Sequence, residues 1–183
     1  PGTLGEVGIL AGEAPAEEHN VYISQCHTSG IVGDPDNIFG LYSASAIIGG
    51  IRGCNSRILN CSSSADVYAV GRASAVTRQP VIGGTDTIGN FLFTGTLTKR
   101  GITSDCYVMV PNAQDSWVVS ENGYFDSDKV KPYNDATNYN NLGRSTAYLQ
   151  SAEFVNILNA YVDDWNATHT YKLDYWEVQE NGY

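Results

Sequence analysis

Acidic residues that lie close together are the first candidates for chemistry in this chain. Two carboxylates on either side of a sugar linkage can act as the general acid and general base that hydrolyse it, and carboxylates in a turn can bind calcium. The candidate pairs are Asp34 with Asp36, Asp126 with Asp128, and Asp163 with Asp164.

The first pair has the chemistry of a turn, because Asp34 is followed by Pro35 at the second turn position. Neither this run nor the run from Asp126 to Asp128 matches a full calcium loop. The third pair falls near the end of a predicted helix, where the helix dipole disfavours negative charge. We therefore predict no carboxylate dyad, no metal site and no cofactor. The residues kept as candidate metal ligands are Asp34, Asp36, Asp126 and Asp128.

Histidine and cysteine add no recognisable catalytic pattern. His19, His27 and His169 form neither the H-E-x-x-H motif of zinc peptidases nor a helical ligand pair. Cys26 and His27 are strand neighbours that point to opposite faces, which excludes a thiol–imidazole pair. The Gly-x-Ser-x-Gly elbow of hydrolases is absent from the sequence. No catalytic residue is therefore predicted.

Aromatic residues are numerous enough to supply a binding surface, since the chain has 12 Tyr and 3 Trp. Such rings combine a large apolar area with a polar tip. We expect most of them, Trp165 included, to pack inside the fold. Trp117 and Tyr124 stay as candidate ligand-binding residues, for a host glycan or a host protein.

The composition limits the class of protein and its partners. Only 16% of the residues are charged, and the usage of Gly, Ser, Thr, Asn and Tyr is typical of β-rich extracellular domains. Ten basic and 20 acidic residues give a net charge of −10, which repels phosphate and excludes nucleic acid as a partner. No apolar run reaches the roughly 18 residues of a membrane-spanning helix. The chain begins at Pro1 without a signal peptide, and we interpret it as a fragment.

An internal repeat organises the first two thirds of the chain. Ile51-Arg52-Gly53 followed by Ile58 to Cys61 recurs 30 residues later as Val81-Ile82-Gly83 followed by Ile88 to Phe91. An earlier copy runs from Leu10 to Val32 with a polar insertion, and we expect a degraded fourth copy to begin at Gly101.

The spacing inside one copy indicates how the copies pack. Apolar residues are neither strictly alternating nor helical in period, which predicts a corner inside the run. One copy cannot bury its apolar face alone, so stacked copies should place Ile58 beside Ile88 and Cys61 beside Phe91. Cys26 and Cys61 share one repeat position and are predicted to be buried, free thiols.

The clearest copy, Gly49 to Val67, resembles a GLUG-motif repeat, whose pattern is GGLVG, a short Asn-Ser-Gly turn, and I-x-N-C-Y-A-T-G-x-V. The second half matches better, because Arg52 replaces an aliphatic residue of the pattern and Ser62 replaces its Tyr. The resemblance covers about residues 5–107. It implies an extracellular or surface-anchored bacterial protein with no catalytic residues in the repeat.

The C-terminal part predicts a helix and a strand. Ser151 is a good N-cap, Glu153 suits the first turn, and apolar residues follow at helical spacing. Alternating aromatic residues then predict a strand over 171–178. The expected fold is mainly β: a short β-solenoid over residues 1–125, a polar linker or loop over 126–145, and a helix-plus-strand cap over 146–183 that covers the open end of the stack.

These features predict a non-catalytic module of a secreted or surface-anchored bacterial protein, used for binding, adhesion or as a stalk. Two alternatives stay open. The first is a non-catalytic region of an immunoglobulin A1 metallopeptidase, which the resemblance also implies. The second is a carbohydrate-active β-solenoid enzyme, which would need a groove with at least two converging carboxylates.

Overall fold

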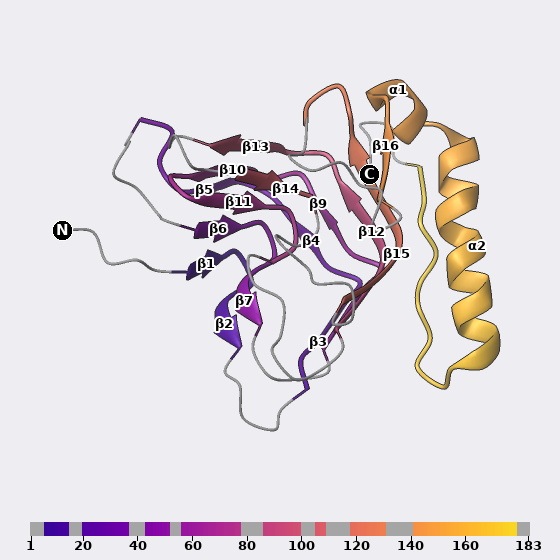
Figure 1. The fold of residues 1–183 in the computed structure, drawn as a ribbon. Coiled ribbons are helices and arrows are strands. Elements are labelled where there is room, and N and C mark those ends of the chain that lie inside the picture. Colours follow the sequence, from indigo (N-terminus) through magenta and orange to yellow (C-terminus); the bar gives the residue numbers. More distant parts are fainter. Residues whose placement is uncertain are drawn as a thin grey trace.

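The computed structural model describes residues 6–14, 20–36, 43–51, 56–77, 86–99, 105–108, 118–130 and 141–178. These residues form a mainly β fold with parallel sheets and two α-helices (Figure 1). Within this part of the chain no helix is long and apolar enough to cross a membrane.

The strands belong to four sheets that the chain visits in the same order twice, from β1 to β5 and from β6 to β10. The seven-stranded sheet consists of β3 (Tyr22–Ser24), β4 (His27–Thr28), β8 (Arg57–Leu59), β9 (Ser62–Ser63), β12 (Asp86–Phe93), β15 (Val118–Asp126) and β16 (Asn141–Arg144). The four-stranded sheet consists of β1 (Glu6–Gly8), β6 (Ser43–Ser45), β11 (Arg72–Ser74) and β14 (Asp105–Tyr107). The smaller sheets are β5 (Ile31–Val32), β10 (Asp66–Ala69) and β13 (Thr96–Lys99), and β2 (Ala11–Ala14) with β7 (Ile48–Ile51).

Strands of successive repeat copies pair at the predicted register. Ile88 of β12 is the partner of Ile58 of β8, which is in turn the partner of Ile23 of β3. Ile58 and Ile88 are buried in one core cluster together with Cys61 and Phe91. The predicted alignment, with Ile58 next to Ile88, is therefore confirmed.

Each of these runs contains one residue with a left-handed backbone, at the place where the spacing predicted a corner. At the corner the backbone enters the left-handed region, which asparagine tolerates better than most residues with a side chain. The corner turns the chain so that Ile58 and Cys61, three positions apart, are both buried. The corner residues are Gln25 (φ 56°), Asn60 (φ 55°), Asn90 (φ 52°) and Asn122 (φ 52°).

The fourth copy lies further along the chain than the sequence predicted. Cys106 of β14 pairs with Ala73 of the four-stranded sheet, so β14 does not belong to the sheet that holds the Ile58–Ile88 row. That row continues in β15, where Ser120 is the partner of Ile88. This copy is hard to recognise in the sequence, because a polar residue stands at the isoleucine position and the step is 32 residues instead of 30.

Cys26 and Cys61 are free thiols, as predicted. Cys61 and Cys106 are buried, whereas Cys26 is only half-buried. Cys26 precedes β4, which pairs with β9 on one side only, so its first-layer position leaves it less covered. Cys54 lies outside the described residues.

Helix α2 (Ala152–Thr168) crosses the outer face of the seven-stranded sheet, preceded by the short α1 (Thr146–Leu149) (Figure 1). The predicted N-cap is confirmed, because Ser151 accepts a hydrogen bond from the Phe154 amide. Leu92 and Tyr124 of the sheet pack against Phe154 and Leu158 of the helix.

The C-terminal segment therefore differs from the predicted end cap. Val162 of α2 packs with Leu59, which lies in an earlier strand than Leu92 and Tyr124. Helix α2 therefore spans strands from three successive copies along their outward side. The outward apolar residues of the runs explain this position, since they would otherwise face water. The predicted linker also contributes structure, because β15 ends at Asp126 and Asn141–Arg144 forms β16.

The strand predicted over 171–178 is not formed. Two asparagines of α2 replace a strand partner for this segment. Asn159 exchanges hydrogen bonds with the backbone of Trp176 (2.7 and 3.0 Å), and Asn166 does the same with Leu173 (2.8 and 2.9 Å). The segment is thus extended, but its backbone is bound by side-chain amides instead of a neighbouring strand. An alternating sequence pattern is the same in both cases, so it cannot distinguish them.

Candidate functional site

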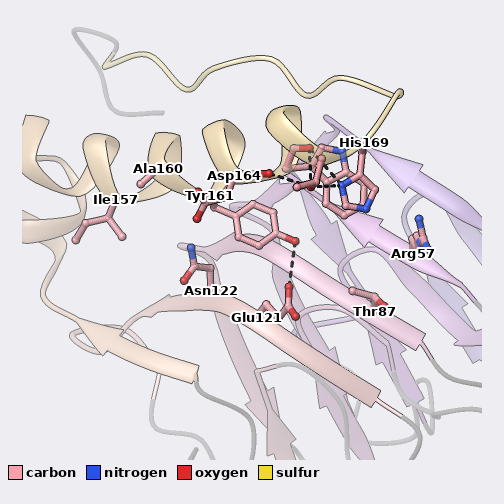
Figure 2. Close-up of a pocket in the computed structure, with 11 residues that line it drawn as sticks. Arg57, Thr87, Glu121, Asn122, Ile157, Ala160, Tyr161, Asp164 and His169 are labelled. Atoms are coloured by element: carbon pink, nitrogen blue, oxygen red, sulfur yellow. Dashed lines mark hydrogen bonds between the residues drawn. The ribbon is translucent and has the colours of Figure 1, made fainter.

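A groove of about 700 Å³ lies between α2 and the outer face of the seven-stranded sheet. Its floor includes side chains of successive strands: Arg57 of β8, Thr87 of β12 and Glu121 of β15 (Figure 2). Arg57 and Thr87 are direct strand partners. The parallel register therefore brings together residues that are about 30 positions apart in the sequence.

Gly89 controls how closely the helix approaches this floor. A methyl group on Gly89 would lie 2.2 Å from the hydroxyl oxygen of Tyr161 and 2.9 Å from Cδ2 of Leu59. Only a residue without a side chain fits under Tyr161 in this geometry. The neighbouring Leu59 and Glu121 are the strand partners of Gly89 on its two sides.

Tyr161 bridges the helix and the sheet. Its hydroxyl lies 3.4 Å from Oε2 of Glu121 and donates to that carboxylate (Figure 2). Burial raises the pKa of Tyr161 above its usual value, and the negative charge of Glu121 raises it further. The phenol is therefore a neutral donor at physiological pH, and it holds one carboxylate of the groove in place.

A row of stacked rings forms the helix wall of the groove. Trp165 stacks on His169 with ring centroids 3.6 Å apart and planes 3° from parallel, and Tyr161 lies 6.5 Å from Trp165. The Arg57 guanidinium carbon lies 5.9 Å from the centre of the Trp165 ring, within the range of a cation–π contact. The indole also donates to the carbonyl of Tyr171 (2.9 Å). Trp165 is thus fixed on several sides and is not a mobile surface ring.

A second, smaller cavity of about 220 Å³ adjoins the groove, with Arg57 and Trp165 contributing to both. Tyr22 and Tyr171 line it and are 64% and 54% exposed. The Tyr171 hydroxyl is held by Ser24 Oγ (2.9 Å) and by the Gln25 side-chain amide (3.0 Å). An exposed ring whose tip is fixed in this way costs little conformational entropy when a ligand contacts it.

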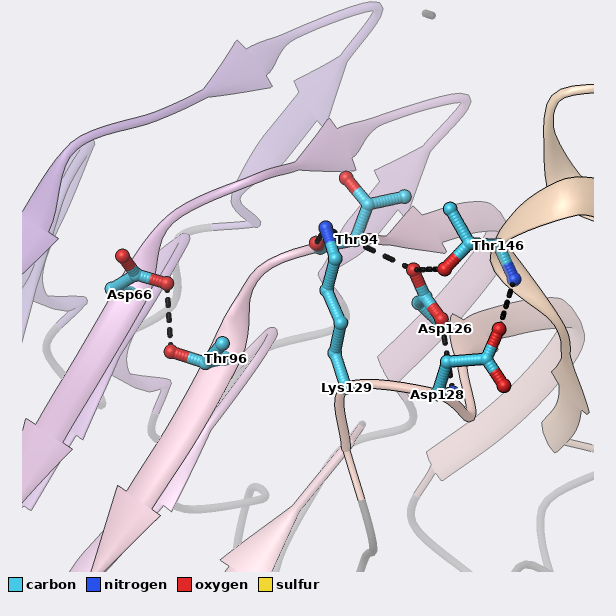
Figure 3. A network of polar contacts seen from close by, with 7 residues as sticks. All are labelled: Asp66, Thr94, Thr96, Asp126, Asp128, Lys129 and Thr146. Carbon is cyan, nitrogen blue, oxygen red and sulfur yellow. Dashed lines mark hydrogen bonds and ion pairs between the residues drawn. The ribbon is translucent and has the colours of Figure 1, made fainter.

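The residues predicted as metal ligands have structural roles. The Asp34 carboxylate accepts the backbone amide of Asp36 (2.8 Å), which is the predicted turn. Asp126 is 1% exposed and accepts the Thr146 hydroxyl (2.7 Å), and Asp128 accepts the Thr146 amide (2.8 Å) (Figure 3). Both carboxylates therefore anchor the start of α1. In the part of the chain that the structure describes, no three His, Cys, Asp or Glu residues gather as a metal site.

Tyr124, one of the two predicted binding residues, does not line the groove. Tyr124 is 3% exposed and packs edge-on against Phe154, with ring centroids 4.9 Å apart, so no ring face is open to a ligand. Trp117 lies outside the described residues. Of the third acidic pair, Asp164 lines the groove, whereas Asp163 accepts the Tyr175 hydroxyl (2.7 Å).

His27 points outward, as expected for the residue after Cys26, and contacts two serines that the sequence did not single out. Its Nδ1 lies 2.8 Å from Ser62 Oγ and its Nε2 lies 3.2 Å from Ser64 Oγ. A catalytic serine–histidine pair needs a third group, usually a carboxylate, on the second ring nitrogen. Here a serine hydroxyl occupies that position, so the cluster has no acidic group to orient the imidazole.

The groove could not be predicted from the sequence, because its residues come from four distant segments and share no motif. Comparison with known proteins finds no matching family model, no matching curated protein and no matching solved structure. The functional argument therefore rests on the site itself.

Proposed function

We propose that this chain is a non-catalytic binding module of a secreted or surface-anchored bacterial protein, built as a short β-solenoid. The observation that carries the proposal is the groove between α2 and the seven-stranded sheet. Its walls come from a packed helix and from paired strands, which hold side chains more accurately than loops do.

The strand register supports the solenoid. Rows such as Ile23, Ile58 and Ile88 continue through successive copies, and the chain returns to the same sheets in the same order. Parallel pairing of short strands from one copy to the next is the arrangement expected of stacked repeats. The similarity of Gly49 to Val67 to GLUG-motif repeats favours the same architecture and an extracellular setting.

The contents of the groove favour binding. Arg57, Glu121 and Asp164 offer charges of both signs, while Tyr161 and Trp165 add aromatic area. Concave sites that combine aromatic surface with a few fixed polar groups are the usual form of a ligand site.

Blocking the groove tests the proposal. The purified chain is applied to arrays of glycans and of host proteins, including immunoglobulin A and mucin, beside two variants of α2. Ala160→Arg places a long side chain in the groove, whereas Ala167→Arg makes the same change at an exposed alanine outside it. The proposal requires a ligand whose binding Ala160→Arg abolishes and Ala167→Arg preserves. Equal binding by both variants would remove the groove from the function.

A carbohydrate-active enzyme is the second candidate, because Glu121 and Asp164 line the same groove. Two carboxylates that face one sugar linkage are the minimum for glycoside hydrolysis. The test is release of reducing ends from oligosaccharides by the purified chain, with Glu121→Gln and Asp164→Asn beside it. Turnover that both variants abolish would replace the binding module with an enzyme.

A further inference from the structure

We infer that the groove and the adjoining cavity bind a neutral oligosaccharide. This inference rests on the proposed function and narrows it to one class of ligand. It follows from the charges of the site, from the hydrogen-bonding groups it exposes and from its fixed aromatic rings.

The charges of the groove are mixed in sign and disfavour a strongly anionic ligand. Glu121 and Asp164 lie in a chain of net charge −10, so a phosphorylated, sulfated or sialylated ligand would be repelled. A cationic peptide would instead meet Arg57, which already lies against the Trp165 ring. A neutral ligand with both donors and acceptors can pair with the carboxylates and with Arg57 alike.

The polar groups of the site match sugar hydroxyls. A hydroxyl both donates and accepts, and it can be held by a carboxylate on one side and by a guanidinium or hydroxyl on the other. Glu121 and Asp164 offer acceptors, Arg57 offers donors, and Thr87 offers both. Arg57, Glu121 and Asp164 are exposed in the groove, so a ligand can reach them.

The aromatic rings add a site for the apolar face of a sugar ring. Tyr171 keeps 54% of its surface exposed although its hydroxyl makes two hydrogen bonds, so the ring is held at the surface instead of folding into the core. Tyr22 is exposed beside it in the same cavity. Because Arg57 and Trp165 line both cavities, one ligand can occupy the aromatic cavity and the polar groove together. A ligand of at least two sugar units fits this arrangement.

The test is titration of the intact chain with neutral oligosaccharides of hexose and N-acetylhexosamine units, with sialylated and sulfated counterparts in parallel. Binding is measured by calorimetry and by tryptophan fluorescence at low and high salt. Asp164→Asn and Tyr171→Ala should each weaken binding about tenfold or more, as expected for lost hydrogen bonds to a charged group and lost ring contact. The matched controls are Asp163→Asn and Tyr175→Ala, which change the same residue types outside the groove. Circular dichroism checks that all four variants fold.

The outcomes separate the two proposals. Neutral oligosaccharides that bind with little dependence on salt, and that lose affinity only in the two groove variants, support the inference. Binding restricted to sialylated or sulfated sugars, or to a protein or peptide in the groove, overturns the neutral ligand but leaves the binding module. Absence of binding to every member of the glycan and protein arrays overturns both.

Discussion

Asn90 connects the corner of one repeat copy to its neighbour and to α2, and replacing it tests both connections. The residue is fully buried with a φ of 52°. Its side-chain amide donates to Oδ1 of Asn60 (2.7 Å) and to the carbonyl of Leu158 (3.1 Å). One side chain therefore links two stacked corners and the helix that covers them.

Two variants separate the backbone contribution from the side-chain contribution. Asn90→Ala loses two hydrogen bonds, worth about 1 kcal/mol each, and must hold a left-handed backbone at a cost of about 1 to 2 kcal/mol, so unfolding should become about 3 to 4 kcal/mol easier. Asn90→Gly loses the same hydrogen bonds, but glycine adopts the left-handed backbone without strain. Its more flexible unfolded chain adds only about 0.5 to 1 kcal/mol, for a total loss of about 2.5 to 3 kcal/mol. The buried Oδ1 of Asn90 has no hydrogen-bond partner among the described residues. Both variants remove this unsatisfied oxygen, which lowers the destabilisation of each by the same amount.

Equilibrium unfolding in urea, followed by circular dichroism, measures these differences. Asn156→Ala, at an exposed position of α2, is the control and should stay within about 0.5 kcal/mol of the parent. Asn90→Gly at least as destabilised as Asn90→Ala would refute the backbone argument. Both variants within about 0.5 kcal/mol of the parent would refute the hydrogen-bond argument as well.

Three further predictions concern the core, the groove and the thiols. Ile88→Ala should lower the free energy of unfolding by about 2 to 4 kcal/mol in the same urea assay, and a loss below about 1 kcal/mol would contradict its core position. Folding raises the pKa of Tyr161, so the contribution of the neutral phenol to stability is complete below about pH 10 and is lost as the pH rises further. Tyr161→Phe should therefore reduce the fall of the urea midpoint above about pH 10. An unchanged fall would count against the burial of the phenol. Burial raises the pKa of the Cys61 thiol to about 12, so a thiol reagent at neutral pH should modify Cys61 only after urea unfolds the chain, and rapid labelling of the native protein at Cys61 would contradict this.

The inward-facing part of the fold was predictable from the sequence because stacking imposes its own period. Ile58 and Ile88 must match in kind, since each packs against the other, and this match is visible as a repeat. The corner was predictable for the same reason, because apolar residues at 58 and 61 cannot share a face of a straight strand. The copy in β15 was missed since Ser120 stands at the isoleucine position.

The position of α2 was not predictable from its own pattern. An amphipathic helix shows that one of its faces is covered, but not by which surface. The relevant signal lay elsewhere, in the outward residues Leu59 and Leu92, which are apolar where a solvent-facing strand position would be polar. The groove depends on this position, so neither Arg57 nor Glu121 could be assigned to it from the sequence.

The outward positions of the repeat explain why a site forms at this place on the sheet. Leu59, Gly89 and Glu121 are strand partners in three successive copies, yet they differ completely in size and charge. Leu59 packs under Val162, Gly89 leaves room for the Tyr161 hydroxyl, and Glu121 accepts its hydrogen bond. Inward positions such as Ile23, Ile58 and Ile88 are similar because neighbouring copies fill one core, with Ser120 as an exception, whereas outward positions can diverge without disturbing that core. The divergence along this single row sets the distance of α2 from the sheet and places a carboxylate beside the Tyr161 hydroxyl.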